Sequence, residues 1–382
     1  MLHMTYARQR LWLGITGVGG TVLLCTAAVA FDLPHRLMHP LADQTYGSAL
    51  SWIALAWMLH AALLVPVDIL GGLVVVRETP GVLRWIASWL RGVAVQWLWF
   101  TLAAALLLRT AQQFGLTYAM LVFLLLQVTL LSRQGLIAWL VGGVNVQATS
   151  VNLAAAAQQA GLSANEVRQV RGNDPSFVGG WTGVEARRLW VPLHWIELLS
   201  PEQLVVALKR RAAVRSAGLR RRGVLVAVAW NTVGFVLASS APHADLVTAA
   251  GFVSMMAWFT LWSFLGVLVL PSLSRPAVLA ADAVAAHTND RALVAATITM
   301  LDQWQDDEAE RDARVETVFH PVPSRGARLR ALADTGAAVS SPAAWHATRM
   351  MLYLSWAGLG GLSRAVHCNV GRPPLWVMLP GD

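Results

Sequence analysis

Six long apolar runs without a charged residue constrain this chain more than any other feature of its sequence. A helix that spans a membrane needs about 20 apolar residues, because each residue advances the helix by about 1.5 Å. Uncharged runs of this size lie at residues 11–31, 44–67, 92–108, 114–132, 223–244 and 246–274. We therefore expect a mainly α fold, a polytopic membrane helical bundle with six spans.

The composition supports this class and excludes others. Only 13% of the 382 residues are charged, against about 25% in soluble domains, which excludes a purely cytosolic enzyme, a disordered chain and a fibre. The net charge of +8 comes from arginine, since Lys209 is the only lysine. Arginines beside membrane spans mark cytoplasmic loops, so we expect the lipid bilayer as a partner and no nucleic acid.

The arginines fall almost entirely into alternate loops, and this predicts the orientation. One side holds Arg8, Arg10, Arg77, Arg84, Arg91, Arg133, the run 209–222 and Arg275. The opposite loops hold Arg36 and Arg109. Because the positive side is cytoplasmic, we expect both termini and the soluble segments in the cytoplasm. In a bacterium this would be the inner membrane.

Four parts follow along the chain from this topology. We expect a four-span region at 1–142, a cytosolic segment at 143–222, two further spans at 223–274 and a cytosolic helical segment with an amphipathic tail at 275–382. The uncharged part of the tail is too short to span a membrane. It is therefore expected to lie at the interface or to pack on the cytosolic part.

The segment 143–222 has the pattern of a small α/β unit. The pattern predicts a helix at 151–160, strands at 167–170 and 189–193, and a glycine-rich turn between the strands. Ser200, Pro201 and Gln203 then form an N-cap, a first helical residue and a capping box, which predict the start of another helix. Residues 276–317 have a helical pattern.

These fragments, in this order, resemble a known family: the HtpX-like and CAAX-prenyl-endopeptidase-like integral-membrane zinc metallopeptidases, which are gluzincins. The likeness covers residues 145–335 and rests on Ser200-Pro201-Glu202, on Ser274-Arg275 with Ala281-Asp282, and on His320-Pro321 before the helix at 328–332. It implies a small cytosolic α/β metallopeptidase-like domain that is split by two spans.

The same resemblance shows what this chain lacks. In the family, H-E-x-x-H follows the helix start, and its two histidines hold zinc while its glutamate acts as general base. Counting from Ser200 places this motif on residues 210–214, where Arg210, Arg211 and Val214 stand. The third ligand of the family, a glutamate, falls on Val278.

The resemblance therefore implies a degenerate homologue with no catalytic residue, no metal and no cofactor. In place of the zinc, we expect Arg210 or Arg211 to bind Asp282 and Val214 to lie near Val278, because a guanidinium can bind a carboxylate with two hydrogen bonds. The alternative is that both arginines point into solvent.

Other polar residues have two interpretations each. His60 lies inside a span, where ionisable groups mark functional sites, although a neutral histidine bonded to a neighbouring helix is the favoured explanation. His35 and His39, with nearby aspartates, form either a metal site or an ordinary polar loop. Arg220, Arg221 and Arg222 either anchor the next span or bind anionic lipid. His367 and Cys368 are expected to pack structurally.

The predicted function is that of a catalytically inactive metallopeptidase-like subunit that binds or assembles other proteins in the membrane. Its protein partner cannot be named from the sequence. An active membrane zinc metalloendopeptidase whose ligands lie elsewhere is the alternative. A third class is a protein that passes lipids or substrates through a chamber between its spans.

Overall fold

The computed structural model describes residues 4–38, 45–78, 80–172, 174–305, 307–334 and 343–378. The chain forms two compact units, and each is described by itself. Unit 1 comprises residues 1–131, 228–266 and 351–376, and unit 2 comprises residues 132–227, 267–350 and 377–382.

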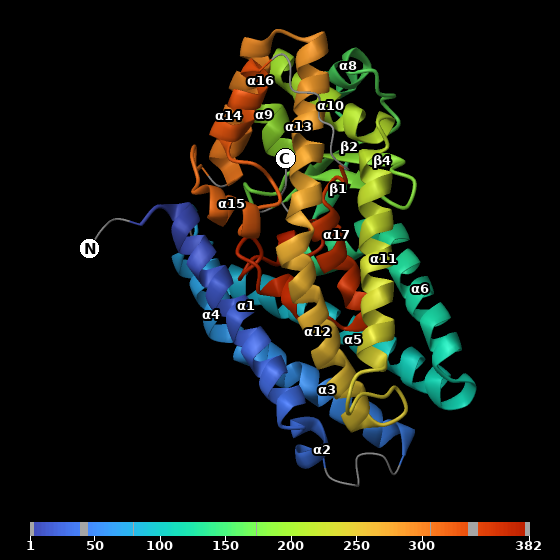
Figure 1. Cartoon of the computed structure of the whole chain (residues 1–382). Helices are drawn as coiled ribbons and strands as arrows, with labels where there is room; N and C mark the ends of the chain where they lie inside the picture. The colour runs from blue at the N-terminus through green and yellow to red at the C-terminus, as the bar shows by residue number, and fades with distance from the viewer. Residues whose placement is uncertain are drawn as a thin grey trace. The chain divides into compact units, whose positions relative to one another are not determined.

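Unit 1 contains the long apolar helices (Figure 1). They are α1 (Tyr6–Ala30), α3 (Tyr46–Leu63), α5 (Val82–Phe114), α6 (Leu116–Ser132), and the greater part of α11 (Leu219–Ser239) and α12 (Ala249–Val269). In the part of the chain that the structure describes, five of these can cross a membrane by length and composition. A sixth span results if α6 is joined to α7 (Gln134–Gly142) across a bend. The prediction of a polytopic helical membrane protein is confirmed.

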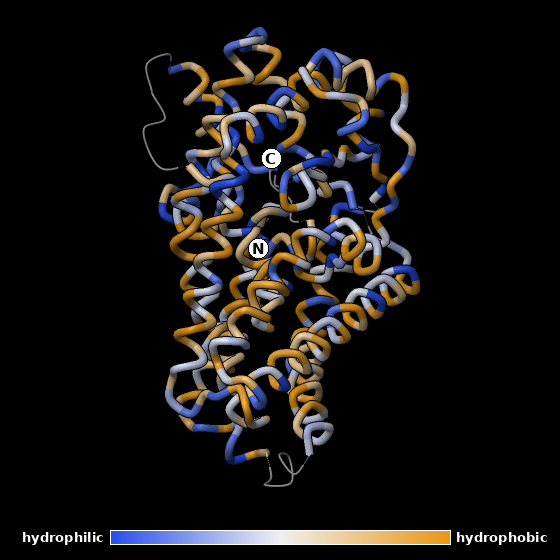
Figure 2. Tube along the Cα trace, turned by 90° about the vertical axis from the view of Figure 1, so that its right-hand side faces the viewer, coloured by the Kyte–Doolittle hydropathy of each residue, from blue (hydrophilic) through white to orange (hydrophobic). Residues whose placement is uncertain are grey.

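The reason for this architecture is the composition of the helices, whose residues are mostly hydrophobic (Figure 2). Only 22% to 50% of the best apolar window in each candidate span is buried inside the protein. The rest of the apolar surface must therefore face lipid or another apolar partner. Helix α5 extends beyond the predicted apolar run at 92–108 on both sides. It continues past Arg91 and Arg109, the two residues that flank this run, and their long side chains can reach the membrane surface.

Short elements complete unit 1. They are α2 (Leu33–Leu37), α4 (Val65–Ile69), the π-helical η2 (Leu70–Val74) and the 3₁₀ turns η3 (Ser355–Gly358), η4 (Leu362–Arg364) and η5 (Pro373–Leu375). Gly71 and Gly72 in η2 have no room for a side chain, because a Cβ atom there would clash with Val370 and with Trp85. The two glycines thus let the C-terminal segment approach η2 closely.

The C-terminal segment differs from the prediction. The sequence favoured a tail at the interface or on the cytosolic part, but residues 351–376 belong to unit 1 and are almost entirely buried. Asp68 is also buried, and its carboxylate binds Arg364. The sequence could not show that these two charges, 296 residues apart, neutralise each other inside unit 1.

Unit 2 contains a small sheet. Its described strands are β1 (Asn145–Gln147), β2 (Val167–Arg171), β3 (Gly180–Thr182) and β4 (Arg188–Pro192), in the order β1-β2-β4-β3. Strands β2 and β4 are parallel, and the two outer strands pair antiparallel to them. The sequence analysis predicted β2 and β4 but missed the two outer strands, which are only three residues long.

The helices of unit 2 surround α10. They are α7, α8 (Val151–Gln159), α9 (Leu193–Leu198), α10 (Pro201–Ser216), α13 (Pro271–Thr288), α14 (Arg291–Gln305), α15 (Ala313–Phe319), α16 (Arg325–Ala333) and the start of α17 (Ala347–Leu354). Helix α10 packs against α8, α13 and α14, and α16 packs against α13 and α14 (Figure 1). The helix predicted at 151–160 and the predicted start at Pro201 both agree with the structure.

Candidate functional site

The candidate site lies in unit 2, where α10, α13 and α16 meet. Helix α10 starts as its sequence predicts: the Ser200 side chain accepts a hydrogen bond from the Gln203 amide, and the Gln203 side chain accepts one from the Ser200 amide. The next helical turns carry Arg210, Arg211 and Val214 into the interior, where these residues are 0%, 3% and 0% exposed.

Helix α13 presents the opposite wall. Ser274, Val278 and Asp282 follow one another at intervals of four residues, and all three are buried. Residues four apart lie on one face of an α-helix. This face therefore carries Asp282 toward α10, against which α13 packs.

Helix α16 contributes the third side chain. His320 and Pro321 lead into it and are buried. The hydroxyl of Ser324 accepts a hydrogen bond from the Ala327 amide and caps the helix. One turn after the cap, Arg328 is 2% exposed and points to Asp282.

The three side chains form a buried ion cluster. Arg210 Nε donates to Asp282 Oδ1 at 2.6 Å. Arg328 donates twice, from Nε to Oδ2 at 2.8 Å and from Nη2 to Oδ1 at 2.9 Å. None of the three side chains is more than 2% exposed. The expectation that Arg210 or Arg211 binds Asp282 is confirmed for Arg210. The second guanidinium, from Arg328, was not expected.

The cluster keeps Asp282 ionised. Burial alone would raise the pKa of this carboxyl, but the charges of Arg210 and Arg328 and their hydrogen bonds outweigh it and lower the pKa below its usual value. A two-point guanidinium–carboxylate contact is among the stronger pairings available to a protein. The cluster therefore ties α10, α13 and α16 together through one carboxylate.

Arg211 has a different role. Its Nη2 donates to the Val178 carbonyl at 3.0 Å, and its guanidinium lies 5.5 Å from the centroid of the Trp195 ring. The Trp181 indole donates to the Arg211 carbonyl at 2.7 Å. Arg211 thus holds β3 and α9 against α10. The glycine-rich segment that the sequence predicted as a turn contains strand β3, which takes part in this contact.

The apolar positions of the site join the main core of unit 2. Val214 and Val278 are fully buried members of one hydrophobic cluster, which also contains Leu208, Ala277 and Ala281. Both valines thus lie in the apolar packing between α10 and α13.

Two other histidines of unit 2, His194 and His287, are not part of the ion cluster. His194 packs edge-on against Trp304 with the ring centroids 5.4 Å apart, and its burial lowers its pKa from 6.5 to about 4. His287 is exposed. In the described segments, no three His, Cys, Asp or Glu side chains lie together in a way that could hold a metal ion.

Of the histidine pair His35 and His39, only His35 is described, since His39 lies outside the described residues. His35 binds Asp32 at 2.7 Å, and His243 approaches the same carboxylate at 3.6 Å. His243 was not expected there.

The Cys368 thiol donates to Asn369 Oδ1 at 3.5 Å, and Asn369 in turn donates to the Ser363 carbonyl. These contacts agree with the structural packing that was expected for Cys368.

The arginine run after α10 is not uniform. Arg220 is 5% exposed and donates to the carbonyls of Gly183 and Val184, so its side chain caps the β3–β4 turn and does not face lipid. Arg221 and Arg222 are exposed. This difference could not be predicted from the sequence, because the three residues are adjacent and identical.

Comparisons with known proteins show the fold. No family model and no curated protein matches the sequence. Among solved structures, Ste24p of S. mikatae is similar, with a TM-score of 0.66 and 14% sequence identity over 80% of this chain and 81% of that chain. The chain is an integral membrane protein with a Ste24p-like fold.

Proposed function

We propose that this chain is a membrane metallopeptidase-like protein without peptidase activity, which acts as a binding or assembly subunit of a membrane complex. Ste24p, whose fold it resembles, is a CAAX prenyl protease of the membrane zinc metallopeptidases. The observation that carries the proposal is the Arg210–Asp282–Arg328 cluster, which joins three helices where the family alignment expects the zinc centre.

The chemistry of the site supports this proposal. Zinc in proteins is held by thiolate, imidazole or carboxylate ligands. Arginine remains protonated and offers no lone pair, so neither Arg210 nor Arg211 could be a ligand or a general base. Both oxygens of the Asp282 carboxylate already accept hydrogen bonds from guanidinium groups. A zinc ion does not fit this set of donors.

A cluster of this kind also suits a scaffold. It fixes the relative positions of α10, α13 and α16 without a metal, and a defined surface is what a binding or assembly subunit requires.

Elemental analysis of the purified full chain tests the proposal. We expect substoichiometric zinc and no chelator-sensitive cleavage of a quenched fluorescent peptide. The variants His194→Ala and His320→Ala, measured in parallel, would reveal any residual zinc site that uses these histidines. One zinc per chain, removed by a chelator together with proteolysis, would support the active metalloendopeptidase instead.

The proposal includes a location in the bilayer. The arginine distribution favours both termini and unit 2 on the cytoplasmic side. Exposed Arg221 and Arg222 are suited to anionic lipid, at about 1 kcal/mol per arginine near the membrane surface. Arg220 is left out, because its guanidinium is occupied by the β3–β4 turn.

A further inference from the structure

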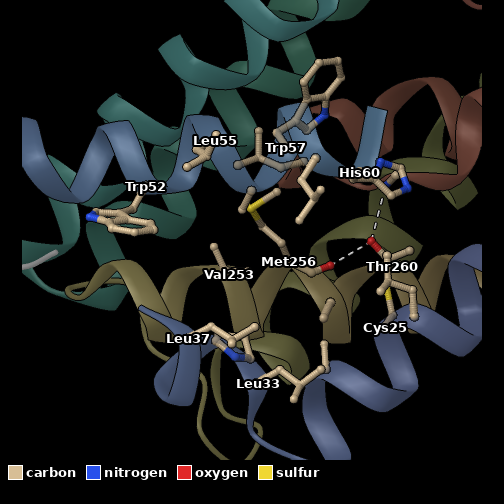
Figure 3. A pocket seen from close by; sticks show the side chains of 18 of the residues that line it. Cys25, Leu33, Leu37, Trp52, Leu55, Trp57, His60, Val253, Met256 and Thr260 are labelled. Carbon is tan, nitrogen blue, oxygen red and sulfur yellow. Dashed lines mark hydrogen bonds between the residues drawn. The ribbon is translucent and has the colours of Figure 1, made fainter. Parts of the chain in front are cut away.

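An apolar pocket in unit 1 lies between three candidate spans, far from the ion cluster in sequence. It has a volume of about 280 Å³ and is formed by α1, α2, α3, α12 and residues 359–361 (Figure 3). Small-molecule sites in proteins are mostly apolar pockets of roughly 300–1,000 Å³ with a few polar groups that fix the orientation of the ligand. The pocket is near the lower end of this range.

The rim of the pocket is hydrocarbon. Leu37, Leu55, Leu59 and Leu63 all line it and are between 53% and 72% exposed. On membrane spans, exposed leucines of this kind contact acyl chains and not water. A molecule that enters here therefore comes from the lipid phase.

The polar groups gather at one end. Figure 3 shows the His60 ring beside the Thr260 hydroxyl, with Cys25 nearby, whereas Trp52 and Leu37 lie toward the other end. His60 Nε2 is buried and has no hydrogen-bond partner. The Thr260 hydroxyl is already engaged, because it donates to the Met256 carbonyl and accepts from the Gly361 amide. It also accepts the hydrogen bond that Figure 3 draws from the other nitrogen of His60, so Nε2 of the neutral ring is an acceptor.

The position of the His60 ring depends on Gly361. A Cβ atom at residue 361 would lie 2.8 Å from His60 Cε1 and 3.0 Å from His60 Nε2. Glycine therefore gives the imidazole its place at the end of the pocket. A buried polar atom without a partner carries an unfavourable free energy of desolvation, which a ligand hydroxyl that donates to Nε2 would remove.

The lining also limits the charge of a ligand. No Lys, Arg, Asp or Glu is among the described residues that line the pocket. A charged head group would enter this surface without a counter-charge, at a high cost in desolvation. An uncharged head with one hydroxyl group can donate to the buried Nε2 of His60 and needs no counter-charge.

We propose that this pocket binds one long-chain neutral lipid from the bilayer, with its hydrocarbon chain along α12 and a hydroxyl group at its end that donates a hydrogen bond to His60 Nε2. This site is independent of the proposed loss of peptidase activity, since all its residues belong to unit 1 and none to the ion cluster. It gives the chain a lipid-binding function in the membrane.

Photolabelling of the full chain in detergent micelles tests the site. The probe is a long-chain alcohol with a diazirine in mid-chain, compared with the matching alkane probe that has no hydroxyl. We expect the alcohol to label peptides of α3 and α12 that contain Trp57 and Met256, and an excess of unlabelled alcohol to compete. Even labelling of all exposed helices, without competition, would overturn the proposal on the wild-type protein alone.

Two substitutions on α3 form a matched pair. Ala56→Trp fills the pocket and is expected to abolish the specific labelling, whereas Met58→Trp, two residues away at an exposed position that does not line the pocket, should leave it unchanged. Val253→Trp on α12 provides a second filling variant if Ala56→Trp does not fold. Unchanged labelling in a folded filling variant would exclude this pocket.

The polar end has its own test. His60→Phe keeps an aromatic ring but removes the nitrogen, and it should weaken alcohol binding about fivefold, the value expected for one net hydrogen bond. Binding of the alkane probe should not change, which also shows that the variant is folded. His60→Gln retains a hydrogen-bond acceptor, its amide oxygen, and should recover part of the alcohol binding. Equal losses for both probes would contradict the role of Nε2.

Discussion

At the scale of single residues, Asp282 and its two arginines depend on one another. Transfer of three charged side chains from water into the interior has a high desolvation cost, which only mutual pairing offsets. The pairing is two-point for Arg328 and single for Arg210. Loss of the carboxylate would therefore leave two buried guanidinium groups without their shared counter-charge.

We expect Asp282→Ala to lower the free energy of unfolding by about 3–5 kcal/mol, the range for removing one partner of a buried ion pair. Thermal unfolding in detergent measures it. Glu310→Gln is the matched control, because it removes an exposed acid that also binds an arginine, Arg330, at 2.7 Å. If Glu310→Gln unfolds at a temperature as low as that of Asp282→Ala, the burial of the ion pair does not determine the loss of stability.

His194 provides a pH dependence. Burial lowers its pKa from 6.5 to about 4, while the charge of Asp174 opposes this shift. The folded protein thus favours the neutral form of His194. The stability that this preference contributes is complete above pH 6.5 and is lost as the pH falls toward 4. The shift corresponds to about 3 kcal/mol at most.

The unfolding midpoint should therefore fall more steeply between pH 6.5 and pH 4 in the wild type than in His194→Phe. Midpoints measured by tryptophan fluorescence at half-unit pH steps test this. If both proteins show the same slope, other groups carry the pH dependence and the assignment to His194 is wrong.

At the scale of elements, the C-terminal segment shows best where sequence reasoning succeeds and fails. Periodicity and capping predicted α8 and α10, because those signals are local. The burial of residues 355–376 depends on distant contacts: Arg10 donates to the carbonyls of Gly71, Val75, His367 and Val370, and Asp68 accepts from Arg364, Trp89 and the Gly371 amide. A single sequence does not show such pairings.

We expect Arg364→Gln to loosen this segment, because the substitution leaves the buried Asp68 carboxylate without its arginine. Hydrogen exchange in detergent should increase across residues 355–378 while the α10 peptides remain protected. Arg109→Gln, at an exposed arginine of α5, is the control. Unchanged exchange at 355–378 would mean that packing alone holds the segment.

At the scale of the whole molecule, the sequence predicted the class of protein and one contact of the candidate site. The apolar runs predicted the spans, since a bilayer leaves few alternatives. The motif alignment predicted the Arg210–Asp282 pair. Arg328 was missed because residues 328–332 served only to support the resemblance to the family, and no contact was predicted for their side chains. The pocket at His60 was missed because it requires the packing of four separate segments.

The orientation in the membrane is the prediction that belongs to this scale. The arginine-poor loop after α11 contains the exposed Ser240, and the α/β part of unit 2 contains the exposed Asn165. In a chain with Cys25 and Cys368 replaced by serine, we expect Ser240→Cys to react with a membrane-impermeant maleimide applied to intact cells. Asn165→Cys should react only after the cells are opened, because the positive side of a membrane protein faces the cytoplasm. Labelling of both sites after lysis is the control for accessibility. The reverse pattern in intact cells would invert the topology and place the arginine-rich loops outside.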